Sequence, residues 1–479
     1  MTKSSFYEMS IPQQNFRAPL KFNQNGTYVA VTEQDNLSIF NINPFGKIFE
    51  LQGTSSGLYK SIDLNNASGI MTREELGGVL TGRYLIEMLF ATSLIAVVDT
   101  IQQPKKLKII NTKRKAAICE LKFDHNVQQI CLNRKRLVIL LQSKQIFIYD
   151  ISCMQLLHTI DIMEDKVIKE LVLKQQQKSW LLKNMAVRGT TSEMDGNQTK
   201  EDDAYSYEVK MKLSGDDKSI LVYTTYSLST VDPREDETEI TESNENIQKN
   251  VNPKGSSASA NKLKITLNNI MVFDALNLAQ LNFLPRVHNR NVQCLSLSHD
   301  GSTVVTASTR GTIIRCFKTS QEQSCFKEFR RGNRPCTITQ LEMDHGIALL
   351  ACVGNSDTIH IFQMNKENAA SLADKNTPNN SIPSSSSSPG MALPSTIRHE
   401  SKFTRVSKFI SSNIVSHLPR QNLERNYAYI KKQNEKEIVM IGFSNSSQDK
   451  MYVCYGDRLE VYELPSQPGS CLLTQTHVF

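Results

Sequence analysis

The sequence predicts an all-β protein, a seven-bladed β-propeller with two long disordered loop insertions. Short apolar runs of β type recur along the 479 residues, each bounded by Gly, Asn, Asp or Ser. The runs come in groups of three or four, and the groups repeat after roughly 40–45 residues, which is typical of propeller blades. No strong amphipathic helix separates the runs, and this disfavours a sheet built from alternating strands and helices.

The repeated groups give the expected blades in order along the chain. Several groups contain a similar strand, as in IFIYD at 146–150 and IMVFD at 270–274. The fourth group is the least regular, because it combines 167–173, 219–225 and 270–283 around an insertion. The other expected strands are 28–31, 38–42, 86–98, 107–111, 129–132, 137–141, 146–150, 293–298, 304–308, 313–317, 338–343, 348–353, 358–363, 438–443, 451–455 and 459–463.

Two polar segments fall outside the expected blades. The first, 187–262, is rich in Ser, Asn and Glu, and the second contains five consecutive serines at 384–388. Neither segment has enough apolar surface to offset the entropy that ordering would cost. We therefore expect a propeller over 20–464, with a disordered loop of blade four at 187–262, a second long loop, of blade six, at 365–437, and tails at 1–19 and 465–479.

Composition narrows the class of protein. The longest apolar run, near 85–98, is interrupted by Glu87, Thr92 and Ser93, so it is too short and too polar to span a bilayer. Residues 1–14 have no apolar block and do not resemble a secretory signal. The ten cysteines occur singly, which argues against zinc and disulfides and favours the cytoplasm. A net charge of +7 indicates an anionic partner, either nucleic acid, a membrane surface or an acidic protein.

Phe329-Arg330-Arg331-Gly332 is the most informative short motif. Neighbouring side chains of an extended segment point to opposite faces, so Arg330 and Arg331 are expected to serve two different pockets. The planar guanidinium group can hold a phosphate through two parallel hydrogen bonds. The motif therefore predicts two phosphate pockets, one on each side of a strand end.

The residues around this motif resemble a known family. They are ASTRGTIIRCF at 307–317, CVGNSDTIHIF at 352–362, FNQNGT at 22–27 and NPFGK at 43–47. Together with the arginine pair, they resemble the PROPPIN family, the phosphoinositide-binding β-propellers of autophagy, from about Leu20 to Leu464. The resemblance implies a lipid-binding site made by the two arginines and seven other residues. These are His288, Ser308, Thr312 and Arg315 with Arg330 in one pocket, and Ser356, Thr358 and His360 with Arg331 in the other.

The residues alone leave other interpretations open. Ser308 and Thr312 could be turn residues around a glycine, and His360 alternates with apolar neighbours and could face solvent. Arg315 lies in an apolar strand, where an arginine requires either an anion or a carboxylate. Three residues that follow the motif, Asn333, Arg334 and Thr337, are left out of the expected site, because this stretch varies within the family.

An amphipathic segment at about 397–420 is the second strong signal. Its apolar residues recur every three or four positions, opposite a basic face that lacks acidic residues, which predicts a helix lying in a membrane interface. The resemblance places a membrane-inserting loop of the sixth blade here. The alternative is a helix packed against the propeller. The expected inserting residues are Phe403, Val406, Ile410, Ile414 and Leu418.

Basic clusters suggest a surface for a protein partner, although solvated blade edges would explain them equally well. The residues are Pro104, Lys105, Lys106, Arg134 and Arg136. The resemblance implies protein-binding loops on the second and third blades. These loops recruit either a lipid-transfer protein or the coiled-coil scaffold of the autophagy conjugation machinery, and the form of the 104–108 segment favours the scaffold.

The leading hypothesis is a non-enzymatic peripheral membrane effector. The resemblance implies binding of phosphatidylinositol 3-phosphate and 3,5-bisphosphate on pre-autophagosomal, endosomal and vacuolar membranes, with recruitment of autophagy machinery. The alternative is a WD-repeat scaffold that binds only proteins. Nucleic acid is disfavoured as a partner because aromatic residues make up only 7% of the chain. No GxSxG, HExxH or P-loop motif indicates an enzyme, and we expect no cofactor and no metal.

Overall fold

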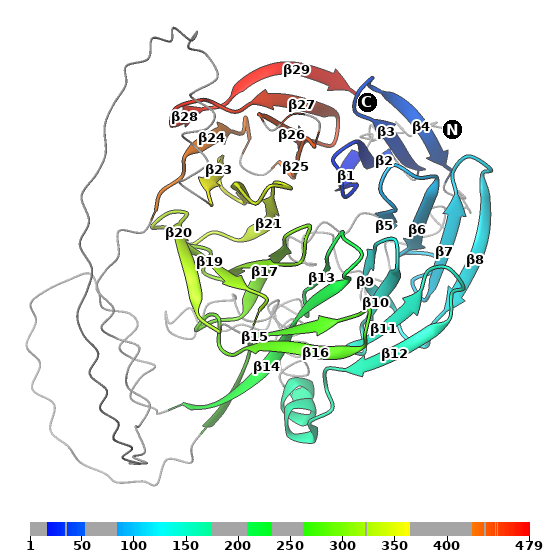
Figure 1. Cartoon of the computed structure of the whole chain (residues 1–479), viewed down its shortest axis with the longest axis vertical. Helices are drawn as coiled ribbons and strands as arrows, with labels where there is room; N and C mark the ends of the chain where they lie inside the picture. The colour runs from blue at the N-terminus through cyan, green and yellow to red at the C-terminus, as the bar shows by residue number, and fades with distance from the viewer. Residues whose placement is uncertain are drawn as a thin grey trace, which may run out of the picture. The chain divides into compact units, whose positions relative to one another are not determined.

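The described part of the chain forms seven sheets arranged around a common centre, and neighbouring strands are antiparallel except for the parallel pair β24 and β28 (Figure 1). The structure is a computed structural model that describes residues 17–33, 36–52, 84–174, 208–231, 262–320, 323–364, 424–434, 437–445, 447 and 449–479. Along each sheet the strands follow sequence order, so each sheet is one blade, and the predicted seven-bladed β-propeller is confirmed. No helix in these ranges is long and apolar enough to cross a bilayer.

The first four blades each contain four strands. Blade one is β1 (Arg17–Phe22), β2 (Tyr28–Glu33), β3 (Asn36–Asn41) and β4 (Gly46–Leu51). Blade two is β5 (Tyr84–Met88), β6 (Leu94–Asp99), β7 (Lys106–Asn111) and β8 (Ala116–Lys122). Blade three is β9 (Val127–Leu132), β10 (Arg136–Leu141), β11 (Gln145–Asp150) and β12 (Leu156–Asp161). Blade four is β13 (Met211–Leu213), β14 (Ile220–Val231), β15 (Lys262–Asp274) and β16 (Ala279–Leu284).

The last three blades complete the ring. Blade five is β17 (Val292–Leu297), β18 (Thr303–Ser308), β19 (Ile313–Lys318) and β20 (Cys325–Arg330). Blade six is β21 (Ile338–Met343), β22 (Leu349–Gly354), β23 (Thr358–Gln363), β24 (Ala428–Lys431) and β28 (Gly469–Ser470). Blade seven is β25 (Met440–Phe443), β26 (Lys450–Cys454), β27 (Arg458–Glu463) and β29 (Leu472–Val478).

The hydrophobic core lies between neighbouring blades. Ile109 of β7 and Ile139 of β10 belong to one buried cluster that joins blades two and three. Ile314 of β19 and Leu341 of β21 do the same for blades five and six. Because a middle strand is covered on both faces, β10 is buried throughout and reads as a nearly continuous apolar run. This arrangement explains why the middle strands were the easiest to recognise in the sequence.

Two glutamines on inner strands tie adjacent blades together. Gln129 of β9 donates to the carbonyl of Met211 at 2.5 Å and accepts from the same residue's amide at 3.1 Å. Gln340 of β21 makes the same two bonds with Ile441 of β25, both at 2.8 Å. Each side-chain amide thus imitates a backbone pairing across a gap between two sheets, so polar groups near the centre are satisfied.

The ring closes between blades seven and one without a shared strand. Phe479 lies 4.7 Å from Phe40 and 5.9 Å from Phe45, measured between ring centroids, and His477 stacks on Phe45 at 4.5 Å. The expected tail at 465–479 is therefore wrong, because these residues form β28 and β29. Beginning at residue 17, β1 also includes the last residues of the expected tail at 1–19.

Other expected boundaries need correction. Within the expected loop at 187–262, β13 and β14 are the first two strands of blade four, and β24 lies within the expected loop at 365–437. Residues 187–207, 232–261 and 365–423 of the two expected loops lie outside the described residues. Each long segment is polar on average, so the short apolar strands inside it were not recognised in the sequence.

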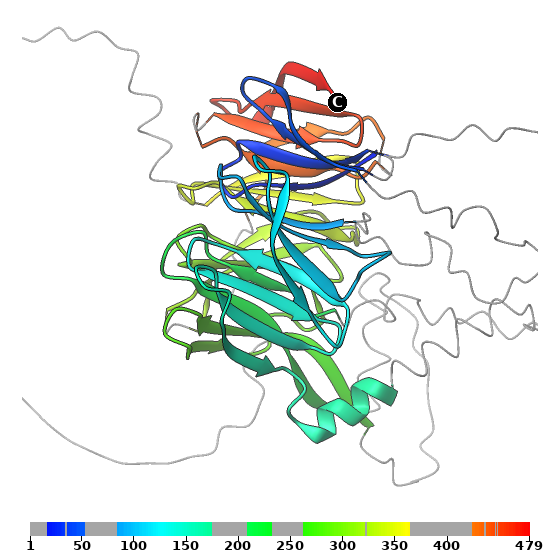
Figure 2. The same ribbon diagram turned by 90° about the vertical axis from the view of Figure 1, so that its right-hand side faces the viewer.

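The segment 167–173, expected to be a strand, is part of a helix over 166–174. Asp165 caps the helix, because its carboxylate accepts from the amides of Val167 and Ile168 at 2.8 and 3.3 Å. Ile168, Leu171 and Val172 follow the helical spacing and pack into the core cluster of blades three and four. The helix lies beside the ends of β14 and β15, as both views show (Figures 1 and 2).

Candidate functional site

The arginine pair stands where β20 of blade five ends. Phe329 is fully buried and packs 4.9 Å from Phe362, centroid to centroid, so it fixes the motif to blade six. Arg330 is exposed, and its Nη1 donates to Asn333 at 2.7 Å. The alternation of a buried phenylalanine with an exposed arginine follows from the strand's period of two residues.

Arg331 is held differently. Its Nε donates to the carbonyl of Gly311 at 2.9 Å, its Nη2 donates to the carbonyl of Arg334, and its amide donates to the carbonyl of Thr312 at 2.9 Å. Within the described chain, no carboxylate lies in salt-bridge range of Arg330 or Arg331, so the charge of each guanidinium group is available to an anion.

The first predicted pocket contains an internal ion pair. Arg315 of β19 lies opposite Glu328 of β20, with 2.7 Å between Nε and the carboxylate oxygen. Its Nη1 also donates to the carbonyl of Val287 at 2.8 Å. Of the two partners that the sequence allowed for Arg315, the structure contains the carboxylate. Arg315 therefore supports the connection between blades four and five, and this connection carries His288.

His288 lies behind the first pocket. Its side chain is 4% exposed, and its Nε2 is 2.9 Å from the hydroxyl of Thr306. Burial, with Arg315 nearby, lowers the pKa of His288 to about 3, so the imidazole is neutral at pH 7. The expectation that His288 contacts a headgroup directly does not agree with this burial. The half-buried Ser308 and Thr312 flank the turn at Gly311, and their hydroxyls bond to no other described residue.

The second predicted pocket combines Arg331 with residues of blade six. His360 is partly buried, and its Nδ1 has no hydrogen-bond partner in the described chain. Burial, assisted by the positive charge of Arg331, lowers the pKa of His360 to about 4. Thr358 donates to the carboxylate of Asp357 at 2.8 Å, and Ser356 donates to the carbonyl of Thr358 at 3.2 Å. These two hydroxyls must therefore turn away from internal acceptors before they can donate to phosphate.

Two lysines of the second pocket were missed by the sequence analysis. Lys431 lies 3.6 Å from Asp357, and the buried Lys432 donates to the carbonyl of Gly354 at 3.2 Å. Both residues follow the short apolar run at 428–430, which was a detectable strand signal inside a segment assigned to a loop. Lys431 lies opposite Thr358 in the sheet, where it adds positive charge that Asp357 partly offsets.

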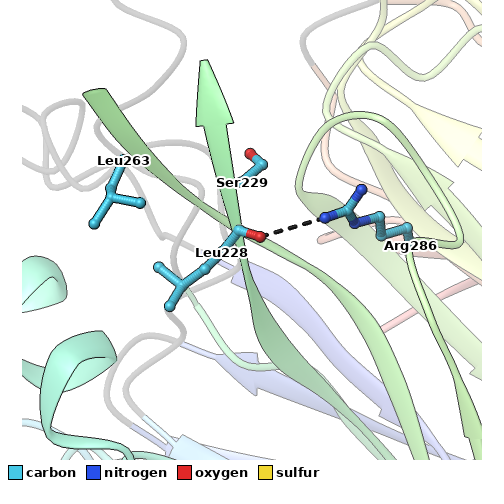
Figure 3. A pocket seen from close by; sticks show the side chains of 4 residues that line it. All are labelled: Leu228, Ser229, Leu263 and Arg286. Carbon is cyan, nitrogen blue, oxygen red and sulfur yellow. Dashed lines mark hydrogen bonds between the residues drawn. The ribbon is translucent and has the colours of Figure 1, made fainter. Parts of the chain in front are cut away.

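A hollow of about 400 Å³ lies beside β14, β15 and the connection that follows β16. Figure 3 shows Arg286 reaching the backbone of Leu228, where its Nη2 donates to the carbonyl at 3.3 Å. Leu228, Ser229, Leu263 and Arg286 line the hollow, and Arg286 precedes His288 by two residues. No sequence pattern marks Arg286, because it stands alone in the connection after β16.

The predicted partner residues differ in their exposure. Arg136 is 8% exposed, donates to the carbonyl of Ala275 at 2.7 Å and pairs with Asp150 at 3.1 Å, so its place in a partner surface was wrong. Its position opposite Asp150 in the sheet explains this pairing. Lys106 pairs with Glu120 at 2.5 Å.

The other expected residues divide between exposed and undescribed positions. Pro104 is partly exposed, whereas Lys105 and Arg134 are exposed, and the guanidinium of Arg134 lies 4.5 Å from the ring centroid of Phe90. The expected inserting residues lie outside the described residues. They are Phe403, Val406, Ile410, Ile414 and Leu418.

The buried histidines predict a loss of stability in acid. The pKa of His288 is about 3 and that of His360 about 4, both lowered mainly by burial, whereas an unfolded histidine titrates near 6.5. The unfolded state therefore binds more protons below pH 6.5, and stability falls as the pH drops from 6.5 toward 3. His288→Gln should reduce the difference in unfolding free energy between pH 7 and pH 5 by about 2 kcal/mol.

Urea unfolding at the two pH values would measure this difference. The exposed His125, changed to Gln, is the matched control and should leave the difference unchanged. An equal pH dependence of wild type and His288→Gln would contradict the assignment of a neutral, buried imidazole.

Comparisons with known proteins bear on the family and the fold of this chain. The PROPPIN family model matches residues 37–199 and 250–389. Autophagy-related protein 21 of Eremothecium gossypii is 36% identical over 96% of this chain and 99% of its own length, and that of Saccharomyces cerevisiae strain S288c is 34% identical with the same coverage. Autophagy-related protein 18 of Kluyveromyces lactis is 30% identical over 74% of this chain and 63% of its own length.

Solved structures show the same fold. One is a complex of KlAtg21 with the coiled-coil of AgAtg16, whose matched chain is 31% identical, with a TM-score of 0.59 over 96% of this chain and 99% of that one. Kluyveromyces lactis Hsv2 matches with 15% identity and a TM-score of 0.53 over 96% of this chain and 99% of its own, which supports the fold alone.

Proposed function

Because this chain belongs to the PROPPIN family, we propose that it is a peripheral membrane effector that binds phosphatidylinositol 3-phosphate and phosphatidylinositol 3,5-bisphosphate. Relatives named autophagy-related proteins 21 and 18 support a role in autophagy. The protein would act from the cytoplasm on pre-autophagosomal, endosomal and vacuolar membranes, where it would recruit autophagy machinery. The proposed activity is binding and recruitment, without a catalysed reaction.

The observation that carries this proposal is the pair of guanidinium groups at the end of β20. Arg330 and Arg331 project to different surroundings, and neither pairs with a carboxylate in the described chain. Each could hold one inositol phosphate through charge-assisted hydrogen bonds. Ser308 and Thr312 would donate hydroxyls on one side, and His360 would offer its unpartnered ring nitrogen on the other.

Membrane binding in this proposal needs more than the two pockets. A headgroup pocket alone binds weakly, so two pockets and one inserted segment would act together through effective concentration. The apolar face of 397–420 would supply the inserted segment. This combination explains how a protein without a membrane-spanning helix in its described residues could stay on a bilayer.

Changing the apolar face tests this proposal. Phe403→Asp together with Ile410→Asp should weaken binding to vesicles that contain phosphatidylinositol 3-phosphate by at least about tenfold, because each buried apolar side chain contributes about 2 kcal/mol. Vesicle flotation measures the effect. Ser412→Asp adds a charge to the polar face of the same segment and should cost less. Unchanged flotation of the double variant would favour the alternative, a WD-repeat scaffold that binds proteins without lipid.

The proposed protein partner is a coiled-coil scaffold of the autophagy conjugation machinery. Its support is the solved complex of KlAtg21 with the coiled-coil of AgAtg16, together with the exposed Lys105 and Arg134 on blades two and three. Acidic side chains of a coiled coil would complement these cations. A lipid-transfer protein is the other candidate that the family resemblance offers.

A further inference from the structure

Lys327 of β20 makes three contacts that use all of its donors. Its Nζ is 3.0 Å from the carbonyl of Gln363, 2.7 Å from the carbonyl of Met364 and 3.1 Å from the carboxylate of Glu424. An ammonium group has three N–H donors, so none is left for solvent or another ligand. The lysine side chain is only 16% exposed, which makes these three acceptors necessary for its charge.

The three acceptors come from the two ends of the blade-six insertion. Gln363 is the last residue of β23, Met364 is the last described residue before 365–423, and Glu424 is the first described residue after it. One side chain of blade five therefore holds the beginning and the end of a long insertion at a single point. Closing such a long loop costs chain entropy, and this three-way contact offsets part of that cost.

Glu424, at the end of the insertion, is also bonded to the arginine motif through the backbone. The amide of Arg330 donates to the carbonyl of Glu424 at 3.0 Å, and Phe329 forms an isolated parallel bridge with Glu424. Lys327 itself precedes Arg330 by three residues on the same strand, with its Nζ 5.1 Å from the ring centroid of Phe329. The residue that ends the insertion is thus bound on two sides to the strand that carries the first guanidinium group.

We propose that Lys327 is a positioning residue that holds the two ends of the blade-six insertion, here called its base, beside Arg330. In this arrangement the two ends of the insertion are held beside the strand that carries the arginine motif. Fixing the base raises the effective concentration of the inserted segment once a headgroup is bound. Lys327 then acts on membrane binding without touching a headgroup. This inference rests on the proposed function.

The test separates binding of a soluble headgroup from binding of a membrane. Full-length Lys327→Met should bind inositol 1,3-bisphosphate as wild type does in calorimetry, because the methionine leaves both arginines unchanged. It should bind phosphatidylcholine vesicles containing phosphatidylinositol 3-phosphate about tenfold more weakly. Lys327→Arg, which keeps a charged donor, should recover part of this loss.

Lys318→Met is the matched control. Lys318 ends the neighbouring strand, contacts Thr303 at 3.2 Å and does not touch either end of the insertion, so vesicle binding should not change. Adding Lys327→Met to Phe403→Asp with Ile410→Asp should cause no further loss, because the inserted segment is already inactive in that background. A further loss of vesicle binding in the combined variant would overturn the inference. So would a fall in headgroup affinity of Lys327→Met as large as its fall in vesicle binding, because Lys327 would then only support the pocket.

Hydrogen exchange distinguishes a failure of this inference from a failure of the proposed function. If the variant Phe403→Asp with Ile410→Asp still binds vesicles as wild type does, insertion of this segment into the membrane is rejected. The contact of Lys327 with the two ends of the insertion can then still be tested. Lys327→Met should then still speed exchange of the Arg330 amide, which is bonded to Glu424. The positioning role would be overturned if Lys327→Met left the exchange rate of the Arg330 amide unchanged. It would also be overturned if Lys327→Met, made in the chain with Phe403 and Ile410 intact, left vesicle binding unchanged.

Discussion

Replacing Arg330 and Arg331 together by threonine is expected to reduce binding to vesicles containing phosphatidylinositol 3-phosphate by more than about 100-fold. A hydrogen bond to a charged group contributes about 1.5–3 kcal/mol, and the double change removes such bonds from both pockets. Each single change should leave one pocket and retain intermediate binding, because the pockets act together. Vesicle flotation at physiological salt measures all three variants.

The control for this experiment must remove the same charge elsewhere. Lys113→Thr with Arg114→Thr removes two adjacent exposed cations from a turn of blade two, and this variant should float almost as wild type does. A double arginine variant that floats like its control would mean that the arginines are structural, and the lipid-binding proposal would be rejected.

Gly311→Ala is expected to damage both stability and binding. Gly311 has φ of +61°, a conformation that disfavours alanine, and an added Cβ would lie 1.8 Å from the carbonyl oxygen of Cys336. The same glycine's carbonyl accepts from Arg331, so the segment carrying that arginine must move. We expect a loss of about 3 kcal/mol or more in unfolding free energy, measured by urea unfolding, together with weaker vesicle binding.

Gly332→Ala is the natural comparison, because this glycine belongs to the arginine motif itself. No atom lies within 4 Å of the position that its Cβ would occupy, and its φ is outside the left-handed region. The change should alter stability by less than about 0.5 kcal/mol. If Gly311→Ala lowered the unfolding free energy no more than Gly332→Ala, the close packing of Gly311 against Cys336 would not restrain Arg331.

Most of the fold could be predicted because blades repeat. The strand expected at 146–150 appears as β11, and the triplet expected from 338 to 363 appears as β21, β22 and β23. By contrast, β29 was missed because it is an outermost strand with largely exposed side chains, which leaves little hydrophobic pattern to read. Outer strands of a propeller are therefore the hardest elements to find in one sequence.

The candidate site was predictable only in part. The alternation of the buried Phe329 with the exposed Arg330 follows from strand geometry, which depends on neighbouring residues alone. The burial of His288 depends on Thr306, and the role of Lys327 depends on carbonyls that any residue type could provide. Such contacts depend on register and on packing between distant strands, which a single sequence does not show.

The closure of the ring has a consequence for synthesis of the chain. Phe40 and Phe479 touch, although they are about 440 residues apart in the sequence, so blade one emerges from the ribosome long before the residues that cover it. The apolar edge of blade one therefore stays exposed to solvent while the later blades are synthesised. Chaperones that shield nascent apolar surfaces would therefore matter most for the earliest blade, and slow translation should lengthen the period in which that blade can aggregate.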